Sequence, residues 1–326
     1  MYYMVGVAGT EIGKAVPDVN ITQVTTGGST ENAKRLIKGE LDMGIVYGSH
    51  VYMSLQQTGP FQNDDKGTML GGVAMAYEGP TYFVTLGDSG IKTLADLAGK
   101  KVALGPPGSG TVFNCSNILT ALGMLDKITP QMMTFADAGR ALGNGQIDVF
   151  CQSSAPAAAV TELAETREIL VLPYEDAQLA KIAEMFPFYH TGTMAKTIYK
   201  GVPETKMPYT TVYWVAHERV AADVVQKIVA AAYEKQDALA KGHKAWAQMK
   251  PDIENFKLSA RRSIQAPRPI TRKRGLGRTE LVAPPSPGAS RRPLPEVERM
   301  SFTAKGHDPR ERSRRRRVGE GEPSAA

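Results

Sequence analysis

Residues 101–122 read KVALGPPGSGTVFNCSNILTAL, and this stretch decides how the chain is expected to fold. Lys101–Leu104 has the apolar character of a buried strand, and Val112–Leu122 has the apolar spacing of a helix. Three glycines, two prolines and two hydroxyl residues join them in Gly105–Thr111. A strand, a glycine-rich loop and a helix in this order are typical of α/β proteins that bind a ligand above the sheet edge.

The loop at Gly105–Thr111 places backbone amides and hydroxyls at a helix N-terminus, where an anion is favoured. Gly105 and Gly110 match the two glycines of the phosphate loop GxxxxGK[ST], but Thr111 stands where the lysine is required. This excludes a nucleoside triphosphatase of that type. The sequence favours a smaller anion such as a carboxylate, held by Ser109, Gly110 and Thr111. The alternative is that Ser109 or Thr111 only caps the helix.

Two further stretches repeat the pattern of glycines, hydroxyls or small residues before a helix. They are Thr25–Thr30, with Gly27, Gly28 and Ser29, and Ser153–Ala158, with Ser154. Ligands of α/β folds bind outside the carboxyl ends of parallel strands, so the three helix N-termini are expected to converge on one site.

Alternating strand and helix patterns over the first 260 residues predict an α/β fold with largely parallel sheets. We expect strands at 20–24, 43–46, 101–104, 147–150 and 210–215, with a further β-rich run at 71–86. We expect helices at 30–38, 91–97, 112–122, 136–142, 176–185 and 222–239. LIKGELD at 36–42 is echoed by LGNGQID at 142–148, each resembling a helix end, a glycine cap and a strand start. Such connections from a helix to a strand are common in α/β proteins. We interpret the repeat as a sign of two equivalent lobes rather than as a chance recurrence of this connection.

Charge divides the chain near residue 260. Residues 261–326 contain 17 Lys or Arg against 7 Asp or Glu, whereas the preceding residues contain 22 against 26. The tail has 15 arginines, nine prolines and one aromatic residue, so it cannot bury enough apolar surface to fold, and we predict it to be disordered. The abrupt change from lysine to arginine is also what a misjoined or out-of-frame 3′ end would produce. We favour that artefact over a functional basic arm.

Catalytic, metal and membrane features are weak in this sequence. The five histidines stand in no metal-ligand spacing, and Cys115 and Cys151 form neither a CxxC motif nor a disulfide framework, so we interpret both cysteines as small core residues. We predict no catalytic residues, no metal and no cofactor. No apolar run is long enough to span a bilayer, so we predict no membrane insertion.

Several motifs in order resemble the TAXI branch of the solute receptors of TRAP transporters. They are TGGSTEN at 26–32, GELDMGI at 39–45, GPF at 59–61, DSGIKTLADLAGKKV at 88–102, GSGT at 108–111, GQID at 145–148, AP at 155–156 and PFY at 187–189. The resemblance covers roughly residues 2–250. It departs from the family at Val112, where Glu is common, and in the absence of an export signal and first strand before Tyr2-Tyr3, which predicts an N-terminal truncation.

The resemblance implies a type II periplasmic-binding fold, in which two α/β lobes joined by crossover strands close over a ligand cleft. Lobe one would comprise 1–84 and 210–260, and lobe two 85–209, with crossovers at Tyr82–Leu86 and Thr210–Val215. The ligand would be a small carboxylate, glutamate-like or a 2-oxo-dicarboxylate, passed in the periplasm to a TRAP permease. Expected ligand-binding residues are Tyr3, Gly27, Gly28, Ser29, Tyr47, Ser109, Gly110, Thr111 and Ser154.

Two other functions stay open at this point. The same scaffold can support an enzyme, for which Cys115 is the thiol nearest a loop. The arginine-rich tail could instead bind nucleic acid, although the body of the protein is mildly acidic and we predict no nucleic-acid partner.

Overall fold

The computed structural model describes residues 2–251, with side chains from Ala8 onward. The predicted disordered tail at 261–326 and the side chain of Tyr3 lie outside this description. The helices are α1 (Tyr2–Ala15), α2 (Ser29–Ile37), α3 (Gly48–Gln56), α4 (Gly110–Ala121), α5 (Phe135–Gly143), α6 (Ala158–Thr166), α7 (Asp176–Met185), α8 (Ala222–Glu234) and α9 (Gln236–Gly242). The strands are β1 (Met43–Tyr47), β2 (Leu70–Pro80), β3 (Tyr82–Leu86), β4 (Lys101–Gly105), β5 (Thr129–Met132), β6 (Val149–Gln152), β7 (Ile169–Val171), β8 (His190–Met194) and β9 (Thr205–His217).

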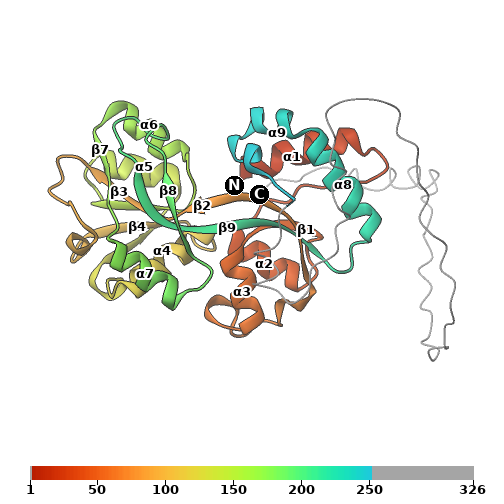
Figure 1. Cartoon of the computed structure of the whole chain (residues 1–326), viewed down its shortest axis with the longest axis horizontal. Helices are drawn as coiled ribbons and strands as arrows, with labels where there is room; N and C mark the ends of the chain where they lie inside the picture. Colours follow the sequence, from red (N-terminus) through yellow and green to blue (C-terminus); the bar gives the residue numbers. More distant parts are fainter. Residues whose placement is uncertain (1, 252–326) are drawn as a thin grey trace, which may run out of the picture. The chain divides into compact units, whose positions relative to one another are not determined.

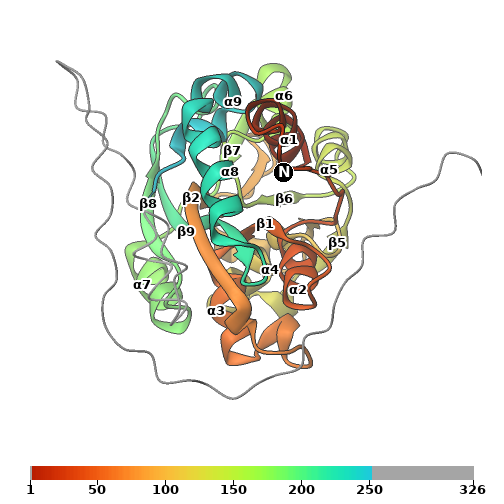
Figure 2. The ribbon, with the colours of Figure 1, turned by 90° about the vertical axis from the view of Figure 1, so that its right-hand side faces the viewer.

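One sheet has the order β1-β9-β2, with β8 also paired to β9, and every pairing in it is antiparallel. Helix α8 packs against β2 and α1 packs against α8 and α9, as Figure 2 shows. Buried side chains including Ile12, Trp214 and Trp246 fill the space between this sheet and these helices. On the sheet's other side, α2 and α3 bury Leu36 and Val51. We call β1, β2 and the adjoining part of β9, together with α1–α3, α8 and α9, the first lobe. Strand β8 and the start of β9 belong to the other lobe, because Met194 and Met207 lie in its core.

The other sheet has the order β5-β4-β6-β3-β7; its strands β3, β4 and β7 are labelled in Figure 1. Strand β4 pairs in parallel with β5 and β6, whereas β3 pairs antiparallel with β6 and β7. Helices α4–α7 contribute to a core that includes Phe83, Phe150 and Ile118. We call this sheet with α4–α7 the second lobe. Parallel pairing is thus confined to β4 and its neighbours, and the expectation of largely parallel sheets is wrong for the first lobe.

The chain crosses between the lobes where β2 passes into β3. Only Thr81 separates the end of β2 from the start of β3, and its amide donates to Pro208 O at 2.8 Å. Beside this crossing runs β9, in which Thr210 is paired with Gly79. Two strands from distant parts of the sequence therefore lie together at the passage between the sheets.

Three expected elements differ in the structure. Residues 20–24 form no strand, because nothing among the described residues pairs with them; Ile21 packs on the core while Val24 is exposed. The helix expected at 91–97 is a 3-10 turn, Leu94–Leu97, capped reciprocally by Thr93 and Asp96. The helix expected at 222–239 is divided at Lys235 into α8 and α9, where the Gln236 side chain donates to two carbonyls of the following segment.

Candidate functional site

The N-terminus of α4 is built as the sequence predicts, by β4, a glycine loop and a hydroxyl cap. Gly105 and Gly108 have φ values of 108° and 76°, in the left-handed region that favours glycine. Ser109 is the N-cap, and its Oγ accepts a hydrogen bond from Val112 N at 3.3 Å. Thr111 is buried, and within residues 8–251 its hydroxyl has no hydrogen-bond partner. The sequence left open that Ser109 or Thr111 serves only as a helix cap. In the structure Ser109 caps α4, and Thr111 does not.

The N-terminus of α2 is organised differently. Gly28 is the N-cap, has φ 132° and offers no side chain to the helix. The amide just before this N-cap is hydrogen-bonded to a carboxylate of α2: Gly27 N donates to Glu31 Oε2 at 2.7 Å. Ser29 is fully buried, and its Oγ accepts from Tyr47 N at 2.9 Å. The polar atoms of this loop are thus largely used within the first lobe.

These two loops contact each other across the lobes. A Cβ on Gly28 would lie 3.2 Å from Ser109 Cα, and one on Gly27 would lie 3.3 Å from Pro107 O. A Cβ on Gly110 would lie 2.5 Å from Tyr47 Cδ2. Only glycine at these positions allows so close an approach. The structure therefore brings together most of the residues that the sequence predicted as a site.

Tyr47 joins the first lobe to the loop that follows β6. Its ring is buried, and its hydroxyl donates to Ser153 O at 2.7 Å. The neighbouring Ser154 carbonyl accepts from Tyr82 Oη at 2.9 Å, while its residue is only half-buried. The loop at 153–154 thus contacts Tyr47 and Tyr82 through backbone oxygens, and the Ser153 hydroxyl accepts from Thr81 Oγ1 at 3.4 Å, whereas no hydrogen bond is made by the Ser154 hydroxyl that the sequence suggested, within the described residues.

His50 lies inside this junction and was not predicted as part of it. Its imidazole is fully buried, with Nε2 2.8 Å from Thr30 Oγ1 and Nδ1 3.4 Å from Ser29 Oγ. The Phe113 ring of α4 stacks obliquely on it, with ring centroids 4.5 Å apart. Burial lowers the pKa of His50 to about 3, so the imidazole is neutral at physiological pH.

Asn114 and Tyr189 extend the polar junction further along α4. The Tyr189 hydroxyl donates to Asn114 Oδ1 at 2.9 Å, and Ser49 Oγ of the first lobe donates to the same oxygen at 3.4 Å. Tyr189 belongs to the PFY motif at 187–189, but nothing in the sequence connected it with Asn114 or Ser49, because 75 and 65 positions separate Asn114 from Tyr189 and from Ser49.

No guanidinium takes part in the junction. Burial raises the pKa of Tyr47, and that of Tyr77 to about 12, so the phenols there are neutral. The arginines of the described chain form ion pairs with carboxylates, and Arg35 pairs with Glu31 beside the α2 loop; the others are Arg140, Arg167 and Arg219. An anion on the α4 side of this junction would meet neutral donors and a helix end.

A disulfide joins Cys115 to Cys151, which corrects the interpretation of these residues as unpaired core cysteines. Both are fully buried, and the bond ties α4 to β6 over a sequence separation of 36 residues. The sequence offered two cysteines without a motif, and only the packing of α4 on β6 brings them within reach. Cys115 is consequently not a free thiol.

The described residues offer neither a metal site nor a membrane span. Among residues 2–251, no group of three or more His, Cys, Asp or Glu side chains is placed to hold a metal ion. In the same part of the chain, no helix has both the length and the apolar character to cross a membrane.

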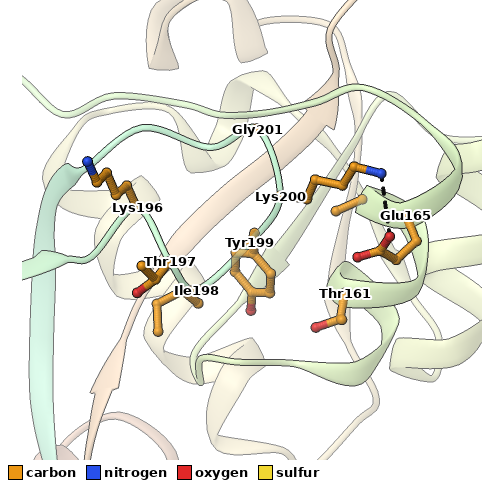
Figure 3. A pocket seen from close by; sticks show the side chains of 9 residues that line it. Thr161, Glu165, Lys196, Thr197, Ile198, Tyr199, Lys200 and Gly201 are labelled. Atoms are coloured by element: carbon orange, nitrogen blue, oxygen red, sulfur yellow. Dashed lines mark ion pairs between the residues drawn. The ribbon is translucent and has the colours of Figure 1, made fainter.

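A separate cavity of about 420 Å³ lies beside α6 (Figure 3). It is lined by Thr161, Ala164 and Glu165 of α6 and by the segment 196–201. Lys200 Nζ lies 3.5 Å from Glu165 Oε2. The Tyr199 hydroxyl, deeper in the cavity wall, accepts from Ala157 N at 2.7 Å. Lys200 is paired with Glu165, whereas Lys196 forms no ion pair within the described residues, and all three side chains are exposed to solvent, unlike the polar groups of the buried junction.

This chain is similar to several known proteins. Residues 1–262 match the model of a family described as the NMT1-like family. The chain is similar to MatC of Rhodopseudomonas palustris, solved with bound malate, at 14% identity and a TM-score of 0.50, covering 78% of this chain and 88% of that chain. It is also similar to the periplasmic aliphatic sulphonate binding protein SsuA of Escherichia coli, at 17% identity and a TM-score of 0.47, covering 79% and 86%.

These comparisons establish the class of fold. The described chain has the mixed α/β, two-lobed fold of periplasmic solute-binding proteins, which confirms the fold class predicted from the sequence. At 14% identity the likeness concerns the fold alone.

Proposed function

The chain belongs to the NMT1-like family, and from this premise we propose that it is an extracytoplasmic solute receptor of the TAXI type that binds a small carboxylate. The lobes at 1–84 with 210–260 and at 85–209 would close on the ligand, and the receptor would deliver it to a TRAP-type permease. The likeness to a malate-bound protein supports a glutamate-like or 2-oxo-dicarboxylate ligand.

The observation that carries this proposal is the meeting of two helix N-termini from different lobes. Gly27 lies close to Pro107, Gly28 lies close to Ser109, and Tyr47 packs on Gly110. Helix N-termini attract anions because of their unpaired amides and dipoles. A receptor needs such groups on both lobes, so that ligand binding and closure are coupled.

Within this site the α4 loop is the principal anion binder. The Gly27 amide is already used by Glu31, and the Ser29 hydroxyl by Tyr47 N, whereas the Thr111 hydroxyl has no partner among the described residues. Gly27, Gly28, Ser29 and Tyr47 would therefore act mainly through close backbone approach and as an apolar wall. Ser154, and Tyr3 from outside the described side chains, complete the proposed set.

The disulfide supports the extracytoplasmic location, because structural disulfides persist in oxidising compartments such as the bacterial periplasm. The same bond weighs against the enzyme alternative. That alternative relied on Cys115 as a nucleophile, and a disulfide sulfur has no thiolate with which to attack. We accordingly propose binding rather than turnover as the activity.

Thr111→Ala tests the site. Removing a hydroxyl that donates to a carboxylate costs about 1.5–3 kcal/mol, which corresponds to a loss of roughly tenfold or more in affinity for 2-oxoglutarate or L-glutamate measured by calorimetry. Thr111→Ser keeps the hydroxyl and should retain most of the affinity. Arg140→Ala is the distant control, because Arg140 is exposed and paired with Asp137, and it should leave affinity unchanged.

Two outcomes would contradict the proposal. One is a loss of binding in Arg140→Ala with Thr111→Ala unaffected. The other is steady conversion of the bound acid into a product, since a receptor releases its ligand chemically unchanged.

A further inference from the structure

The amide of Asn114 presents an unpartnered donor inside the junction. The side chain is fully buried on α4, and its Oδ1 accepts from Tyr189 and Ser49. Its Nδ2 has no hydrogen-bond partner in the described part of the chain. A buried donor without a partner is costly, and few are found in native proteins. Both hydroxyls bond to Oδ1, so the end of the amide that carries the N–H donors is the unpartnered one.

The position of Asn114 relates this amide to the α4 loop. Asn114 follows Gly110 by four residues, so both lie on the same face of the helix. Gly110 packs on Tyr47, which places this face of α4 against the first lobe. The backbone of Asn114 therefore lies about 6 Å, four residues of helical rise, further along α4 than Gly110 at the loop that we assign to the ligand carboxylate.

The surroundings of the amide carry no formal charge. His50 is neutral because burial lowers its pKa to about 3, and burial raises the pKa of Tyr189. Phe113 packs on the His50 ring. Such a place does not attract a cation, and it offers a neutral N–H donor to an oxygen acceptor.

We propose that Asn114 forms a second polar subsite, in which its amide N–H groups bind an oxygen at the far end of the ligand. This inference rests on the proposed function and sharpens it. A separation of about 6 Å corresponds to an acid of about four or five carbons counted with both terminal oxygen-bearing carbons, given C–C bonds near 1.5 Å. The subsite therefore selects dicarboxylates of that length over monocarboxylates of equal length.

The test compares two acids that differ only at the far end. We expect the wild-type protein to bind 2-oxoglutarate at least tenfold more tightly than 2-oxopentanoate, measured by calorimetry on the full chain with its disulfide intact. In Asn114→Leu this preference should fall to within about threefold of unity, because the second carboxylate loses its donor while the first keeps the α4 loop.

Asn117→Leu is the matched control, since it also removes an amide from α4 whose Nδ2 is buried and unpartnered, three residues further along. It should leave the preference unchanged. Asn114→Ala serves if the leucine variant does not fold, as judged by circular dichroism, and should abolish the preference in the same way.

Three outcomes would overturn the inference. A preference that survives in both folded Asn114 variants would show that water, rather than ligand, satisfies the amide. Equal losses in the Asn114 and Asn117 variants would show a structural effect. Equal binding of the two acids by the wild type would refute the second subsite and leave the proposed function standing, whereas binding of neither acid would refute both.

Discussion

The N-termini of α2 and α4 have similar sequences and different chemistry. Both follow a loop of glycines and hydroxyls, and the two loops contact each other through Gly28 and Ser109. At α4 a serine hydroxyl caps the helix, whereas at α2 the Glu31 carboxylate binds the Gly27 amide. The α2 terminus thus already holds a negative charge from its own helix, and the α4 terminus does not. Equivalent loops can therefore contribute unequally to one anion site.

The two termini are also held in place by different means. The disulfide of Cys115 anchors α4 to β6 covalently. The α2 loop is held by hydrogen bonds, above all those that His50 makes with Thr30 and Ser29. Changes on the α4 side are therefore expected to act through chain constraint and packing, and changes on the α2 side through protonation and hydrogen bonding.

Of the changes considered for the two termini, loss of the disulfide should have the largest effect on the stability of the protein. Replacing Cys115 and Cys151 together by alanine opens a loop of 36 residues and should lower the free energy of unfolding by about 4 kcal/mol on the chain-entropy account. Urea denaturation measures the change, and reduction of the wild-type protein should give a comparable loss. A decrease below about 1 kcal/mol would show that packing alone holds α4 on β6.

A methyl group added to Gly110 should have the next largest effect. The Cβ would lie 2.5 Å from the Tyr47 ring and 3.0 Å from Ser29 Cβ, so Gly110→Ala should destabilise the protein by up to about 3 kcal/mol. The matched control is Gly13→Ala on α1, where no atom lies within 4 Å and the stability should stay equal or rise. If thermal unfolding shows equal stability for both variants, the loops are not in contact in solution.

The sequence predicted the loops better than the junction that they form. Gly105–Thr111 and Thr25–Thr30 were recognisable because a helix N-terminus needs local residues of particular types. The places of His50, Asn114 and Tyr189 in the junction were not recognisable, even though Tyr189 lies in the PFY motif, because they depend on contacts between segments far apart in the chain. The pairing of Cys115 with Cys151 was missed for the same reason.

The errors in secondary structure also have a tertiary cause. Residues 20–24 have strand-forming composition, but a strand requires a neighbour, and none of the described strands supplies one. The division of the helix expected at 222–239 follows hydrogen bonds from Gln236 to Trp246 O and Met249 O. Local patterns located most of the elements and could not reveal how each one is partnered.

Acid should weaken the α2 side through His50. The folded-state pKa of about 3 lies below the unfolded value near 6.5, so the neutral imidazole stabilises the folded state above pH 6.5, and this stability is lost as the pH falls toward 3. Between pH 7 and pH 5 the loss from this group should be about 2 kcal/mol. Denaturation at both pH values measures it, and His50→Gln, which cannot titrate, should show a correspondingly smaller pH dependence. Equal slopes for the two proteins would place His50 in contact with solvent.

The smallest effects are expected from substitutions at the helix ends themselves, and these distinguish the role of the α4 N-terminus from that of the α2 N-terminus most directly. Ser109→Ala removes the cap of α4 and should cost about 1 kcal/mol of stability. It should also weaken the binding of 2-oxoglutarate, because the same hydroxyl borders the proposed anion site. Ser109→Thr keeps a capping hydroxyl and is the control for the α4 side.

Glu31→Gln is the corresponding change at α2. It removes the carboxylate charge near Gly27 but keeps an oxygen that can accept from the amide. Because Glu31 is partly exposed, its field is screened by solvent, and affinity for 2-oxoglutarate should rise by no more than about threefold. Calorimetry at low and high salt distinguishes this charge effect from a structural one, since only the former fades with salt. A fall in affinity in Glu31→Gln would reverse the assignment and make α2, rather than α4, the end that binds the anion.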